Sequence, residues 1–286
     1  MYTLGEKKNK SFIPANRMVI VLIICILSQM SLWAGGRGET VVSTAPQGFE
    51  RPKVSQMAET KGIPVELNIR EGDHFMHKLK IMPFIQVKNH PQMVAWCETL
   101  GGQFISTLFI TERIATQSWR SAPGDSQPKE EIRRKESLPV WSHRHGDVYA
   151  DGLHLPTRED PMPDAVTSAT PKNGFRIQTR LPEKIESIMI YFEVNNSADF
   201  NETYTKEEEP GSRAYSGGPW GSGQPALVYG TEVDLRKLQS GTPISLELLG
   251  HSSPDGSSSE IIGDFGGVTT AKEILSGIDV YGVKTN

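Results

Sequence analysis

The chain has 286 residues, of which 37% are hydrophobic and 22% are charged, and its formal net charge is -4. This is the composition of a globular protein with enough length for one sizeable core or two small ones. The acidic balance argues against a nucleic-acid partner, because nucleic acids are bound by basic surfaces.

The N-terminal 36 residues have the pattern of an export signal. Four basic residues precede an unbroken apolar run over residues 18–27, and small residues follow at Ala34 and Gly36. The run is too short for a membrane span and matches the hydrophobic region of a signal peptide. We expect residues 1–36 to be a signal peptide cleaved after Gly36, with an uncleaved anchor as the alternative. The mature protein would then lie in the periplasm or the cell envelope.

After cleavage a single cysteine, Cys97, would remain, so the chain cannot form an internal disulfide and must be stabilised by its core. Cys97 lies in an apolar run and is expected to be a buried, inert thiol. Residues 37–62 are polar and without periodicity, and we interpret them as a flexible tether. The folded domain is expected over residues 63–286.

The first strands are predicted from alternation and β-branched content. Residues 65–70 alternate apolar and polar side chains, and residues 83–87 form a shorter candidate. Residues 93–98 and 104–111 suit a pleated surface, and Gly101-Gly102 between them suits a tight turn. This second pair is predicted to be a hairpin.

The segment 112–163 interrupts the strand pattern. Residues 129–136 form a charge run, expected as a short exposed helix or a solvated loop. Leu138-Pro139-Val140-Trp141 is expected to place an aromatic anchor at the edge of the core. Three prolines between residues 156 and 163 keep the backbone extended.

Regular alternation returns at residue 175. Residues 175–181, 227–235 and 244–248 alternate like half-exposed antiparallel strands, whereas residues 188–192 are more continuously apolar. Residues 278–283 form a last candidate strand. Eight or nine short strands without a long amphipathic helix predict an all-β fold, an immunoglobulin-like antiparallel β-sandwich with long irregular loops.

Several segments together resemble one family. They are PQMVAWCETLGGQFISTLFIT, LPVWSHRHG, DAVTSATPKNG, YFEVNNSADFNETY and GQPALVYGTEVDL, which fall within residues 91–235. In order and spacing they resemble an uncharacterised family of bacterial predicted periplasmic proteins, which are exported, β-rich and often encoded near flavin-transferase and PepSY-type genes. The resemblance implies an exported β-rich protein and brings no catalytic residues.

The stretch from Asp164 to Thr170 resembles the short signature at which a flavin transferase attaches FMN to a threonine. On that resemblance Asp164 is the leading acid, Thr167 the first hydroxyl and Thr170 the acceptor. A phosphoester needs an accessible hydroxyl, and a nearby acid helps to orient it. Ser168 replaces the usual glycine and Pro171 stiffens the loop. The alternative is a loop whose polar side chains bond their own backbone.

Two further clusters could bind metal ions. Asp199, Asn201 and Glu202 lie in an oxygen-rich loop whose alternating donors suit Ca²⁺, although Asx turns at a strand end explain the same residues. His143, His145 and His154 could hold zinc, but they lie in a segment interrupted by glycine and proline, where exposed histidines are expected instead.

The sequence therefore predicts an exported, non-enzymatic β-sandwich accessory or binding protein. Loops 112–173 and 195–224 would form its interaction surface. The alternative is a covalent FMN carrier in an extracytoplasmic electron-transfer system, with the flavin on Thr170 and a membrane redox or envelope protein as partner. A metal-dependent hydrolase built on the histidine loop is a third hypothesis.

Overall fold

The computed structural model describes residues 53–55, 62–82, 85–119, 132–162, 167–168, 171–239 and 242–283. The predicted signal peptide lies outside these ranges. Residues 53–55, inside the predicted tether, form strand β1 (Lys53–Ser55). None of the helices within the ranges is long and apolar enough to cross a membrane.

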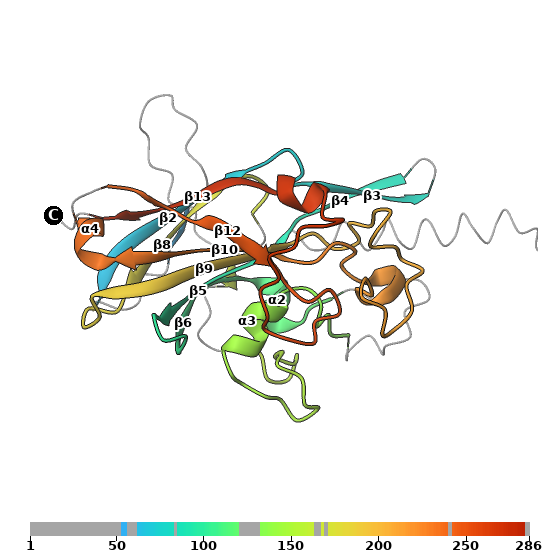
Figure 1. The fold of residues 1–286 in the computed structure, drawn as a ribbon, viewed down its shortest axis with the longest axis horizontal. Helices are drawn as coiled ribbons and strands as arrows, with labels where there is room; N and C mark the ends of the chain where they lie inside the picture. The colour runs from blue at the N-terminus through green and yellow to red at the C-terminus, as the bar shows by residue number, and fades with distance from the viewer. Residues whose placement is uncertain are drawn as a thin grey trace, which may run out of the picture. The chain divides into compact units, whose positions relative to one another are not determined.

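Two sheets pack face to face as a β-sandwich (Figure 1). The first sheet has five strands, all antiparallel to their neighbours except the β1–β8 pair, which is parallel. Across the sheet the strands are β1, β8 (Phe175–Leu181), β2 (Ile63–Glu71), β13 (Leu275–Gly282) and β11 (Ile244–Ser245).

The second sheet has six strands, again antiparallel except at one edge, where β6 and β7 run parallel. Across it the strands are β12 (Glu247–His251), β10 (Leu227–Asp234), β9 (Ser187–Asn195), β5 (Gln92–Thr99), β6 (Phe104–Thr111) and β7 (Thr167–Ser168). Helix α4 (Leu235–Gln239) directly follows β10.

The main core lies between the two sheets. Alternate residues of β8 are buried, so that Phe175, Ile177 and Leu181 point inward. The rings of Phe175 and Phe109 lie 5.3 Å apart between centroids and join the two sheets. Burying one such side chain contributes about 1.5–3 kcal/mol. The predicted antiparallel β-sandwich is confirmed, while the immunoglobulin-like description stays a prediction.

A second core covers the outer face of the six-stranded sheet. It is built by α2 (Glu112–Thr116), α3 (Pro139–Arg144) and the segments beside them. Trp141 of α3 is completely buried, and its indole N–H donates to Thr107 Oγ1 at 3.0 Å. The predicted aromatic anchor therefore exists, but it covers the face of a sheet rather than the edge of the core.

This cover changes the expectation that the charge run at residues 129–136 is an exposed helix or a solvated loop. Ile132, Arg134 and Glu136 are buried, whereas Lys135 is exposed, so the described part of the charge run is only partly solvated. Strand β5 is buried on both faces because one face meets the main core and the other meets the second core. The described parts of residues 112–163 that form this cover are thus structural, which leaves less of them for an interaction surface.

A third, two-stranded sheet stands apart from the sandwich ladders. It is the hairpin of β3 (His77–Met82) and β4 (Ile85–Asn89), drawn in cyan and teal in Figure 1. The Asn89 amide donates to the carbonyl of Ser197 at 3.3 Å, which ties the base of the hairpin to the loop after β9. The same loop carries Asp199.

Candidate metal centre

Two histidines come from the turn that joins β2 to the hairpin. His74 lies in the turn, and His77 is the first residue of β3. Between them Phe75 is 3% exposed and belongs to the main core, so it anchors the turn. The amide of Asn196 donates to the carbonyl of His74 at 2.9 Å. Both histidines are therefore held against the sandwich at one place.

Asp199 comes from the loop that follows β9. Its N–H donates to the carbonyl of Ser222 at 2.8 Å, and its own carbonyl accepts the N–H of Gln224 at 3.0 Å. Gly223, paired with Asp199 in an isolated bridge, has φ +77°, and a Cβ there would lie 2.5 Å from the Asp199 carbonyl. Glycine is thus required for the close approach that fixes the Asp199 backbone.

The carboxylate of Asp199 is held by two neighbours. Thr270 Oγ1 donates to it, at 2.9 Å from Oδ1 and 3.0 Å from Oδ2, and Gln224 Nε2 donates to Oδ2 at 2.9 Å. Gln224 Oε1 in turn accepts the N–H of Thr269 at 2.6 Å. Thr270 begins the short helix η2 (Thr270–Glu273), so the carboxylate is oriented by a segment distant in sequence.

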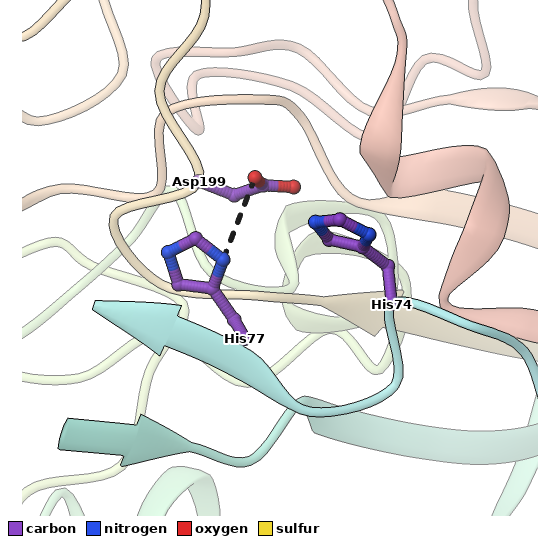
Figure 2. Close-up of side chains that lie close together, drawn as sticks. All are labelled: His74, His77 and Asp199. Atoms are coloured by element: carbon purple, nitrogen blue, oxygen red, sulfur yellow. Dashed lines mark ion pairs between the residues drawn. The ribbon is translucent and has the colours of Figure 1, made fainter. Parts of the chain in front are cut away.

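These elements bring one ligand atom each from His74, His77 and Asp199 within 4.8 Å of one another (Figure 2). Within the cluster, His77 Nδ1 and Asp199 Oδ1 form an ion pair at 3.7 Å. The Asp199 side chain is 5% exposed, that of His77 15% and that of His74 36%. The cluster therefore lies just below the surface, with His74 on its outer side.

His77 Nδ1 is a buried nitrogen that has no hydrogen-bond partner within the described ranges. Buried polar atoms in folded proteins are nearly always paired, with protein, water or an ion. This nitrogen faces a buried carboxylate oxygen of Asp199 at 3.7 Å, and a cation between the two would bind to both.

Burial raises the pKa of the Asp199 carboxyl above its usual range. The hydrogen bond from Thr270 and the nearby His77 and His74 oppose this rise, whereas the negative charge of Glu273 adds to it. A buried carboxylate with a second acid nearby is stabilised by a positive charge, which a divalent cation would supply.

Two imidazole nitrogens and one carboxylate form a ligand set for transition metals. Zn²⁺ binds histidine nitrogen and carboxylate oxygen, and sites with three protein ligands keep a further position for water or another ligand. Two histidines and one carboxylate also suit Fe²⁺. Ca²⁺ takes oxygen ligands only and would not use the histidines.

Of the three residues predicted for calcium, only Asp199 belongs to this cluster. Asn201 Oδ1 accepts the N–H groups of Thr203 and Tyr204, and its amide donates to the carbonyl of Gly267. Glu202 is exposed. Asn201 thus forms the Asx turn that was the alternative interpretation, and a calcium ion itself is not tested by these contacts.

The residues of the flavin hypothesis fall mostly outside the described ranges, namely Asp164 and Thr170. Thr167 begins β7, which pairs with β6 at the edge of the six-stranded sheet. FMN attachment at Thr170 stays a prediction.

The loop histidines do not form a three-ligand group in the part of the chain that is described. His143 and His154 lie 4.3 Å apart between ring centroids, but His145 stacks on Trp141 at 4.7 Å. The side chain of His145 is 2% exposed, contrary to the expectation of an exposed histidine, because it packs against the second core. Burial accordingly lowers the pKa of His145.

A cavity of about 610 Å³ lies elsewhere. Its lining includes Arg133, Lys135, Asp151, Arg158 and Tyr215. Arg133 is paired with Asp151 at 2.8 Å, and Arg158 donates to the carbonyls of Gln117 and Trp119. Arg133 and Arg158 therefore have partners within the protein, and the cavity shares no residue with the metal cluster.

His74 and His77 were not singled out from the sequence. The available signal was the His-x-x-His spacing directly after a predicted strand. Asp199 was singled out, but its partners are more than a hundred residues earlier, and only the packing of the β2–β3 turn on the loop after β9 joins them.

No protein-family model, no curated protein and no solved structure matches this chain. The resemblance to the exported β-rich family therefore stays an expectation from the quoted segments.

Proposed function

We propose that this chain is an exported, non-enzymatic β-sandwich protein that binds a divalent transition-metal ion through His74, His77 and Asp199. Zinc fits best among the common ions, because the set combines two imidazoles with one carboxylate. The observation that carries the proposal is the buried Nδ1 of His77, which has no hydrogen bond within the described ranges and lies 3.7 Å from the buried carboxylate of Asp199.

The outer shell of the cluster supports the same proposal. Ligating carboxylates in metal sites are themselves hydrogen-bonded, and these outer contacts set their orientation. Asp199 has such contacts from Thr270 and Gln224. A cluster formed by chance on a mobile surface would lack this support.

Export is supported by the N-terminal sequence, with its basic region, short apolar run and small residues. An exported protein would encounter metal ions outside the cytoplasm, where the cluster on the β-sandwich would bind them. Cell fractionation and the intact mass of the secreted chain test this part: a full-length cytosolic chain would contradict it.

The metal proposal is tested on full-length exported protein purified without a metal-affinity tag and stripped with a chelator. One equivalent of Zn²⁺ should raise the melting temperature, because a ligand at 100 times its Kd stabilises the fold by about 2.7 kcal/mol. His74→Ala is the informative variant, since His74 is half-exposed and its loss should leave the metal-free fold intact.

His143→Ala provides the matched control, because it removes a histidine outside the cluster. We expect zinc to stabilise this control as it does the wild type and to leave His74→Ala and His77→Ala nearly unchanged. Equal stabilisation of the wild type and both cluster variants would refute the proposal.

A further inference from the structure

Glu273, the last residue of η2, contacts His74 in two ways. Its carbonyl accepts the backbone N–H of His74 at 2.9 Å, and its Oε2 lies 3.5 Å from His74 Nδ1. The side chain of Glu273 is 58% exposed, so it reaches His74 from the solvent side. One residue thus hydrogen-bonds the backbone of His74 and places its carboxylate beside the ring.

The close approach of these two segments depends on Gly72. A Cβ at this position would lie 2.2 Å from the carbonyl oxygen of Glu273. The N–H of Gly72 also donates to the carbonyl of Ile274 at 2.9 Å. The turn and η2 are therefore fastened together by backbone contacts that do not involve the Glu273 carboxylate.

Figure 2 shows His74 with one ring nitrogen facing Asp199 and the other facing away from it. Because Glu273 lies beside Nδ1, the nitrogen left for the cluster is Nε2. We infer that Glu273 is a positioning residue of the metal centre, which keeps the proton of His74 on Nδ1 and thereby presents the Nε2 lone pair to the metal. This inference rests on the proposed function.

The physical basis is the arrangement of carboxylate, histidine and metal. A histidine that donates its second N–H to a carboxylate has a fixed tautomer and a more basic ligand nitrogen, and losing that partner costs 10–100-fold in affinity. Charge acts in the same direction: a divalent ion with one carboxylate ligand keeps a net positive charge, which the carboxylate of Glu273 balances.

Glu273→Ala and Glu273→Gln separate the two effects, and both keep the backbone contact. Glutamine still offers an oxygen to Nδ1–H but has no charge. The exposed Glu260, which lies outside the cluster, supplies the control Glu260→Ala. We expect metal-free melting temperatures close to the wild type for all three, because a single exposed ion pair contributes only about 0–1 kcal/mol.

The first measurement is a competitive titration of full-length protein with Zn²⁺ and a chelator. Zinc affinity should fall by roughly 10–100-fold in Glu273→Ala, less in Glu273→Gln and not at all in Glu260→Ala. An affinity of Glu273→Ala within twofold of the wild type would overturn the inference while leaving the proposed function intact.

The second measurement is the tautomer of His74 in the metal-free protein, observed in ¹⁵N–¹H correlation spectra. A merely structural role for Glu273 would not move this signal. We expect the Nδ1–H form in the wild type and Glu273→Gln, and a shift to the Nε2–H form in Glu273→Ala. The Nε2–H form in the wild type would contradict the inference.

X-ray absorption of the zinc-loaded protein completes the test. An oxygen ligand at about 2.0–2.2 Å from zinc that is present in the wild type and lost in Glu273→Ala would make Glu273 a ligand and overturn the positioning role. A wild type that binds no zinc would overturn the proposed function and this inference together, whereas loss of binding in His77→Ala but not in Glu273→Ala would overturn the inference alone.

Discussion

The carboxylate of Glu193 accepts the backbone N–H of Trp141 at 2.9 Å, beneath the cover of the six-stranded sheet. Its other oxygen accepts the N–H of Val140 at 3.1 Å. Glu193 lies on β9 and is completely buried, so it joins the first turn of α3 to the sheet. This contact connects the second core to the strand that leads to the metal cluster.

Burial raises the pKa of Glu193 from 4.5 to about 8, although the two N–H donors and Arg144 oppose the rise. The folded protein therefore binds this proton more tightly than the unfolded chain does. The resulting stability is complete below about pH 4.5 and is lost as the pH rises through about 8. Between these values the slope is up to about 1.4 kcal/mol per pH unit.

Glu193→Gln should flatten this dependence, because the variant has no titrating proton at that position. The measurement is the free energy of unfolding by denaturant at several pH values from 5 to 9. Subtracting the variant from the wild type removes the contributions of Asp199 and His145, which the two share. Parallel curves for the two proteins would show that Glu193 does not titrate in this range.

Trp141 is the anchor of the second core. Trp141→Ala should lower the free energy of unfolding by about 3–5 kcal/mol, since it leaves a large buried cavity and removes the partner of Thr107 and His145. The exposed Val148 gives the control Val148→Ala, which should change stability by less than about 0.5 kcal/mol. Similar losses in chemical denaturation for both variants would contradict the second core.

Gly223 should be required for the metal cluster. Alanine there would have to adopt φ +77° and would clash with the carbonyl of Asp199. We expect Gly223→Ala to weaken zinc binding more than tenfold and to lower the melting temperature. A Cβ at Gly263 would meet nothing within 4 Å, so Gly263→Ala should bind zinc normally. The measurement is isothermal titration calorimetry of both variants with Zn²⁺. A zinc affinity unchanged in Gly223→Ala would argue against the role of Gly223 in fixing Asp199.

Zinc should also protect the β3–β4 hairpin from hydrogen exchange. An isolated two-stranded hairpin is marginally stable in water, and His77 at its base is a proposed ligand. Metal binding should therefore slow amide exchange in β3 and β4 more than in β8, which lies inside a sandwich sheet. The comparison is exchange mass spectrometry with and without zinc, in the wild type and in His77→Ala; protection that persists in the variant would contradict the link.

Several strands were predictable from their own residues, but residues 244–248, predicted as one alternating strand, are divided between β11 and β12 in different sheets. Residues 104–111 and 175–181 form β6 and β8 with the predicted bounds, because each has one face on the core. Strands β1 and β7 have two or three residues and parallel partners, so no local pattern marked them. The extent of the second core around Trp141 was also not predicted. Arg134 and Glu136 are buried by tertiary contacts, which a run of charged residues in the sequence does not reveal.

The metal cluster could be predicted only in part, for a related reason. Asp199 was recognised among the oxygen donors of its loop. Its neighbours in sequence do not join the cluster, because Asn201 forms an Asx turn and Glu202 is exposed. The nitrogen ligands come from a turn that Phe75 fixes by burial and Gly72 allows to approach η2. Such convergence is a property of tertiary packing, which one-dimensional spacing does not contain.

The most direct test is anomalous diffraction at the zinc absorption edge from crystals of chelator-treated protein given one equivalent of Zn²⁺. The account predicts a single strong peak bound by His74 Nε2 and His77 Nδ1 at about 2.0–2.1 Å and by an Asp199 oxygen at about 2.0–2.2 Å. A peak at the His143–His154 pair instead, or no peak within bonding distance of His77 and Asp199, would contradict it.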